Sequence, residues 1–93
     1  MIKKFRKKMP VIEAIQFLDT TENIDEITMW VEKLGIKEIK VDYSIKDKPI
    51  LKIPFSKTKG VRVARGDYLV KGLDNSLSNC PAIIFEKVYD EVK

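Results

Sequence analysis

The sequence predicts an α+β fold, with one amphipathic helix packed on a curved, mostly antiparallel sheet or partial barrel. Two observations support this prediction. Residues 23–34 place apolar side chains at helical spacing, whereas most of the remaining chain consists of short apolar segments separated by turn residues. A strand, then a helix, then several closely spaced strands suits one curved antiparallel sheet with the helix covering its open face. The length of 93 residues predicts a single domain over 1–93.

The segment 23–34 carries the clearest helical pattern. Asn23 is expected to be the N-cap, with Glu26 at the third helical position as in a capping box. Gly35 follows the segment and can adopt the left-handed conformation that often ends a helix. The apolar stripe expected to face the core consists of Ile24, Ile27, Trp30, Val31 and Leu34.

Strands are expected on both sides of this helix. Residues 11–17 form the first strand, and apolar side chains on both of its faces favour a central position in the sheet. Turns are expected at 65–67 and 72–75, where glycine, aspartate and asparagine tolerate turn conformations. Pro81 is expected to open a single helical turn through Phe85. The other expected strands are 38–43, 49–54, 61–63, 68–71, 76–79 and a closing strand at 86–92.

Positive charge is concentrated in two short clusters within a chain of net charge +4. Residues 57–71 hold five bases against one acid, and such a cluster could attract a phosphorylated ligand or another polyanion. The five bases of residues 1–8, a basic N-terminal segment, are Lys3, Lys4, Arg6, Lys7 and Lys8.

The residue types needed for most catalytic and metal sites are missing from the sequence. It has no histidine, which is the commonest general acid or base near neutral pH and the commonest transition-metal ligand. The one cysteine, Cys80, cannot build a zinc or iron–sulfur site, and the four glycines form no phosphate-binding loop. We therefore expect a non-enzymatic protein without a cofactor.

Two further features concern localisation. No apolar segment suitable for a signal peptide follows the basic start, and no apolar run reaches the roughly 20 residues that span a bilayer. A single cysteine gives no internal disulfide and no sign of an oxidising compartment. These observations predict a cytoplasmic protein that does not act at a membrane.

Two separated stretches of the sequence form a recognisable pattern. The first is KKFRKKMPVIEAIQF at residues 3–17, and the second is VARGDYLVKG at 63–72 followed by CPAIIFEKVY at 80–89. Together they resemble a family of small phage and prophage proteins of uncharacterised role. The family opens with a basic segment leading into VIEAIQW and closes with a PGDYIIKG turn and a CKPDIFEKTYE-like end. Ala64-Arg65 replaces the usual residue-proline pair, and 74–79 differ from the family pattern. The resemblance implies a phage origin and a compact fold, with no catalytic residues to carry over.

The leading hypothesis is therefore a phage-encoded binding protein that counteracts host defence. It could sequester a nucleotide signal, with an anion site formed by Arg62, Arg65, Lys71 and Tyr68, or it could block a host protein.

Two alternatives remain open. A nucleic-acid-binding module would use the basic cluster Lys3, Lys4, Arg6, Lys7 and Lys8, and its affinity would fall with salt. A structural or assembly component of the phage would form a homo-oligomer through a sheet edge.

Overall fold

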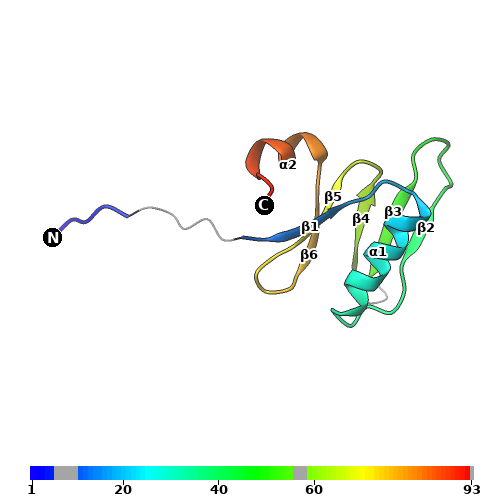
Figure 1. Cartoon of the computed structure of the whole chain (residues 1–93), viewed down its shortest axis with the longest axis horizontal. Coiled ribbons are helices and arrows are strands. Elements are labelled where there is room, and N and C mark those ends of the chain that lie inside the picture. The colour runs from blue at the N-terminus through cyan, green and yellow to red at the C-terminus, as the bar shows by residue number, and fades with distance from the viewer. Residues whose placement is uncertain (6–10, 56–58, 93) are drawn as a thin grey trace.

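The computed structural model describes residues 1–5, 11–55 and 59–92 of the chain. Two helices and six strands lie within these residues, which confirms the predicted α+β class (Figure 1). In chain order the elements are β1 (Glu13–Gln16), α1 (Thr21–Glu32), β2 (Lys40–Asp42), β3 (Ile50–Pro54), β4 (Gly60–Ala64), β5 (Tyr68–Lys71), β6 (Leu77–Cys80) and α2 (Ala82–Val88).

The strands form two three-stranded sheets, not one continuous sheet. Their orders are β1-β5-β6 and β2-β3-β4, and all neighbouring strands are antiparallel. The two sheets meet where β4 lies against β6. Over the described residues the strands do not close into a barrel.

The core lies between the two sheets and α1. Strand alternation sends every second side chain inward, and opposite partners such as Leu51 and Val63 are both fully buried. Helix α1 adds Ile27 and Val31 from its apolar stripe, as expected. The buried hydrophobic cluster consists of Phe17, Ile27, Val31, Leu51, Ile53, Val63, Leu69 and Leu77.

Helix α1 begins two residues earlier than predicted, and its N-cap differs. Thr20 has an extended backbone, and its hydroxyl oxygen accepts a 3.1 Å hydrogen bond from the N–H of Asn23. The prediction of Asn23 as N-cap is therefore wrong, because a threonine three residues upstream takes that role. Gly35 has a φ of +87°, the left-handed conformation expected after the helix.

Strand β1 is an edge strand, so the prediction of a central strand is wrong. Among the described strands it pairs with β5 alone, and the side chains of Glu13 and Ala14 are exposed. The apolar residues on the two faces of β1 therefore do not result from a position between two other strands. Ile15 packs against the core on the α1 side, whereas Ala14 lies on the opposite face of the strand.

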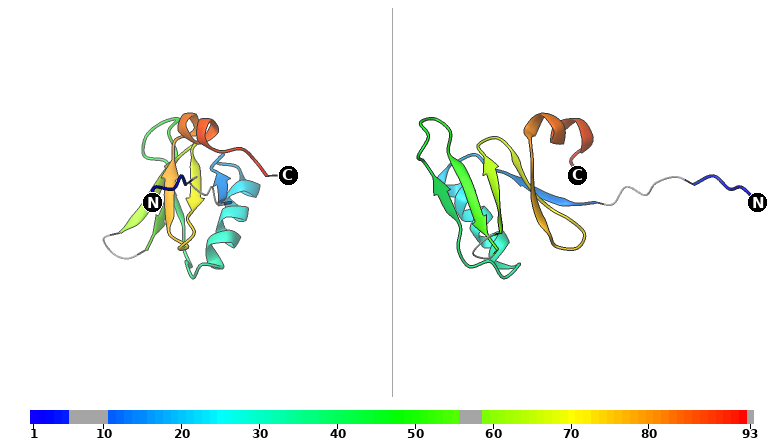
Figure 2. Two further views of the ribbon diagram at one scale, coloured as in Figure 1. Left: turned by 90° about the vertical axis from the view of Figure 1, so that its left-hand side faces the viewer. Right: turned by 180° about the vertical axis from the view of Figure 1, so that it is seen from behind.

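The chain after β6 is helical through Val88, which corrects the prediction of a closing strand at 86–92. The N–H of Tyr89 donates to the carbonyl of Phe85, and residues 89–92 pair with no described strand. The ring of Phe85 stacks on Tyr68 at a centroid distance of 3.9 Å, and Tyr89 packs on Phe85 at 4.8 Å. This aromatic contact holds α2 on the face of β5 away from the core. Figure 2 shows the chain after α2 extending toward the α1 side of the molecule.

Candidate functional site

The outer edge of β1 carries backbone groups that no described strand pairs with. The N–H of Phe17 donates to Asp67 and its carbonyl accepts from Gly66, so Phe17 is turned toward the β5 side. In an antiparallel ladder the orientation alternates, so Ile15 and Glu13 also face β5, while Ala14 and Gln16 face outward. The sheet order leaves that outer side of β1 without a neighbouring described strand.

The side chain of Asn23 completes this edge at one end. Its amide nitrogen donates to the carbonyl of Gln16, and its amide oxygen accepts from the N–H of Leu18, both at 2.7 Å. One buried side chain thus supplies the donor and acceptor that a neighbouring strand would supply. No described strand pairs with the outward N–H and carbonyl of Ala14 or with the outward N–H of Gln16.

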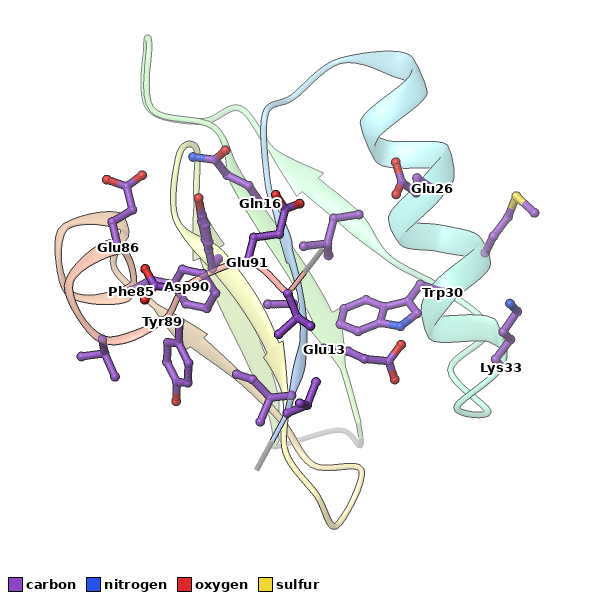
Figure 3. Close-up of a pocket in the computed structure, with 18 residues that line it drawn as sticks. Glu13, Gln16, Glu26, Trp30, Lys33, Phe85, Glu86, Tyr89, Asp90 and Glu91 are labelled. Carbon is purple, nitrogen blue, oxygen red and sulfur yellow. The ribbon is translucent and has the colours of Figure 1, made fainter. Parts of the chain in front are cut away.

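A groove of about 1170 Å³ contains this edge (Figure 3). One wall is a face of α1, and the other is formed by α2 and the chain that follows it. Aromatic side chains contribute to both walls, with Trp30 on α1 and Phe85 and Tyr89 opposite. The groove therefore offers an extended chain a backbone edge between two apolar surfaces.

The charged side chains that line the groove are mainly acidic. Among the described residues, the lining contains one base, Lys33, which is the C-cap of α1. The acids come from both walls and from β1 itself, so negative charge surrounds the edge on each side. They are Glu13, Glu26, Glu86, Asp90 and Glu91.

Glu13 is ionised over a wider pH range than an ordinary glutamate. Its carboxylate is paired with the ammonium group of Lys71. The hydrogen bond and charge of Lys71 lower the pKa of Glu13 below its ordinary value of 4.5, and Lys33 and Trp30 lower it further. The carboxylate of Glu13 therefore stays ionised in mildly acidic solution, with its charge balanced by Lys71.

Removal of the Lys71 ammonium group should raise the pKa of Glu13 toward 4.5. Because the folded-state pKa is depressed, the ion pair contributes stability above pH of about 4.5, and that contribution is lost as the pH falls through the folded-state pKa. An NMR titration of the Glu13 carboxyl carbon in Lys71→Met measures the shift. Lys52→Met is the matched control, because Lys52 pairs with Asp42 instead. Equal Glu13 pKa values in Lys71→Met and in the unsubstituted protein would contradict the assignment.

The four residues of the predicted anion site do not lie together. Tyr68 stacks on Phe85 and lines the groove, while Lys71 reaches Glu13 at the other end of β5. The guanidinium of Arg65 donates to the carbonyl of Asp47 at 3.2 Å, near the turn after β4. Arg62 lies on the solvent-facing side of the other sheet.

Arg62 instead belongs to a row of bases across β2, β3 and β4. Lys40 is opposite Lys52, and Lys52 is opposite Arg62. Asp42 forms a 2.8 Å ion pair with Lys52 and lowers the net charge of the row, and the pKa of Asp42 is itself lowered by this hydrogen bond. Anion binding by the four residues named from the sequence stays a prediction, and the structure places Lys52 and Lys40 in one row with Arg62.

The basic N-terminal segment is described in part. Lys3 and Lys4 lie in an exposed stretch that projects beyond the start of β1 (Figure 1). Arg6, Lys7 and Lys8 lie outside the described residues.

Sequence reasoning missed the α1 wall of the groove. Glu26, Met29, Trp30 and Lys33 recur at steps of three, one and three, so they share a helix face beside the core stripe. The sequence predicts Trp30 as a core residue, and Trp30 does pack against the buried cluster. Its ring also lines the groove. The available signal was Met29, an apolar residue outside the core stripe, which is 65% exposed.

Several classes of site find no support in the described part of the chain. No group of three or more histidine, cysteine, aspartate or glutamate side chains there could hold a metal ion. Likewise, none of the helices formed by those residues is long and apolar enough to span a membrane. No protein-family model, curated protein or solved structure gives a significant match to this chain. The groove is thus assigned from its own geometry.

Proposed function

We propose that this chain is a phage-encoded binding protein, without catalysis of its own, that counteracts host defence in the host cytoplasm. It does so by holding an extended segment of a host protein in the groove beside β1. The observation that carries this proposal is the unpaired β1 edge between two aromatic walls. The phage setting derives from the sequence resemblance at 3–17, 63–72 and 80–89.

The backbone geometry supports addition of a strand. An incoming extended segment can donate to the carbonyl of Ala14 and accept from the N–H groups of Ala14 and Gln16. The aromatic side chains on either side then shield these hydrogen bonds from water, which increases their contribution to affinity. Main-chain bonding of this kind tolerates many partner sequences, so specificity must come from the groove walls.

The walls favour a segment that carries both bases and apolar side chains. Successive side chains of an extended segment point to opposite walls. The α1 wall offers Trp30 with Glu26, and the opposite wall offers Tyr89 with Glu86. Each wall can therefore accept one apolar and one basic side chain, whereas an acidic segment would be repelled.

The nucleotide-sequestering version of the hypothesis has less support. Its four residues are distributed over the groove, the far end of β5, the turn after β4 and the solvent face of the second sheet. A nucleic-acid-binding role has one observation in its favour, the row formed by Lys40, Lys52 and Arg62. That row lies on a sheet face outside the groove lining, so the two functions can be tested separately.

The single tryptophan, Trp30, reports on groove occupancy through its fluorescence. The probe is a capped peptide of alternating Phe-Phe and Lys-Lys pairs, which places both residue types on each face of the extended chain. We expect this peptide to shift Trp30 emission, and the same peptide with glutamate in place of lysine to bind about tenfold or more weakly.

A peptide with the same side chains and N-methylated alternate amides is the backbone control. It should bind weakly, because its methyl groups block strand addition. Equal binding of the methylated and unmethylated peptides would exclude the strand-addition mechanism. Salt-dependent binding of a single-stranded oligonucleotide that leaves Trp30 emission unchanged, with no response to the peptide, would favour the nucleic-acid alternative.

A further inference from the structure

The first five residues form an arm with the composition that the groove favours. In residues 1–5, which we call the arm, Ile2 and Phe5 are 99% and 89% exposed and enclose Lys3 and Lys4. Exposing two large apolar side chains to water is unfavourable unless they pack elsewhere. Two bases between two apolar residues match the acidic and aromatic lining of the groove.

The spacing of the arm fits the groove as well as its composition does. In an extended chain Ile2 and Lys4 point to one side, and Lys3 and Phe5 point to the other. Each wall would thus receive one apolar and one basic side chain. The four residues Ile2–Phe5 extend about 13 Å, at roughly 3.3 Å per residue, which equals the length of the four-residue β1.

The arm is directed away from the groove of its own chain. Figure 1 shows the N-terminus far from the folded body, along the longest axis of the molecule. The extents of the structure are 58 × 27 × 27 Å, and the arm lies at one end of the 58 Å dimension. In this position the arm is available to a neighbouring molecule.

We propose that the arm of a second copy of this chain occupies the groove, giving a two-fold dimer in which the arms are exchanged. Ile2–Phe5 of each chain adds as a strand to the free edge of β1 in the other. The proposal rests on the proposed peptide-binding function and identifies one occupant of the groove. A host segment would then compete with the arm, so binding of the host segment and dimerisation exclude each other.

The test compares the full-length chain with the double variant Ile2→Asp/Phe5→Asp by light scattering over a wide concentration range. Trp30 emission is recorded in the same samples. We expect the unsubstituted chain to reach twice the monomer mass, and the double variant to remain monomeric with red-shifted Trp30 emission. Leu73→Asp is the control, because Leu73 is 75% exposed and lies outside the arm and the groove lining. It should dimerise like the unsubstituted chain.

Three results would overturn the proposal. The first is an unsubstituted chain that stays monomeric, with Trp30 emission independent of concentration and of the arm substitutions. The second is a double variant that still dimerises, which would indicate direct pairing of two β1 edges. The third is a monomeric chain whose Trp30 emission changes in the double variant, which would place each arm in its own groove. In each case, titration of the capped peptide into the double variant still measures peptide binding in the groove. The proposed peptide-binding function is therefore tested separately from the exchanged dimer.

Discussion

Replacing Asn23 with leucine should lower the free energy of unfolding by about 2–4 kcal/mol, because two backbone groups lose their partners. The carbonyl of Gln16 and the N–H of Leu18 each bond to the Asn23 amide at 2.7 Å. Asn23 is 9% exposed, so water has little access to replace these bonds. Leucine has the same number and branching of side-chain heavy atoms, so the substitution removes the hydrogen bonds without leaving a cavity. Urea unfolding followed by circular dichroism measures it.

Two further variants separate the bridging role of Asn23 from a general effect on α1. Asn23→Asp keeps an acceptor for Leu18 but places a carboxylate oxygen against the carbonyl of Gln16, so an intermediate loss is expected. Thr28→Val removes the 2.7 Å hydrogen bond from the Thr28 hydroxyl to the carbonyl of Ile24 and leaves β1 untouched. Its effect should be within about 0.5 kcal/mol. If Asn23→Leu costs no more than Thr28→Val, the bridge does not stabilise β1.

The role of Asn23 also explains why the sequence predicted the helix but assigned its N-cap to the wrong residue. The apolar stripe of α1 depends on local spacing, which a sequence displays directly. Whether the hydroxyl of Thr20 or the amide of Asn23 caps the helix depends on what else each side chain can reach. Asn23 reaches back to Gln16 and Leu18, and that contact exists only after the chain has turned between β1 and α1.

The edge position of β1 could not be predicted for a similar reason. Apolar residues on both faces usually indicate a strand inside a sheet, because both faces are then covered. In this fold α1 covers one face of β1, and the Tyr68–Phe85–Tyr89 contact lies on the other. The same aromatic contact accounts for the wrong strand at 86–92. The spacing of Phe85 and Tyr89 suits one helical turn, and their ring contacts are evident only in three dimensions.

The groove could not be predicted from the sequence, because the residues that form its two walls are far apart in the chain. The α1 wall and the wall formed after β6 are separated by more than half of the sequence. The second basic cluster, at 57–71, led to the prediction of an anion site instead, yet Lys71 of that cluster is paired with Glu13. Charge along the sequence therefore predicted an anionic ligand, whereas the charged residues that line the groove are mainly acids.

Replacing Ala14 with proline should lower the affinity for an extended peptide about 10- to 100-fold while leaving the fold intact. The N–H of Ala14 points away from β5, so proline removes a donor that the sheet does not use. It also places its ring where an incoming strand would lie. The affinity of the capped peptide is measured by Trp30 fluorescence, and the control Ala14→Ser retains the N–H with a side chain of similar size.

Proline at the neighbouring residue, Ile15, should lower the stability of the fold, because the alternation of the ladder turns its N–H toward β5. Ile15 faces β5 opposite Leu69, so proline at residue 15 removes a ladder hydrogen bond and should cost about 3 kcal/mol or more of stability. We expect Ala14→Pro to lose peptide binding and keep its stability, and Ile15→Pro to lose stability. Together these results would show that a partner adds on the side of β1 toward which the Ala14 N–H points. If Ala14→Pro unfolds the protein and Ile15→Pro does not, the ladder has the other alternation and the free edge is incorrectly assigned. If Ala14→Pro is stable and binds the peptide normally, the peptide is held by side-chain contacts alone, and β1 serves only to connect the two walls.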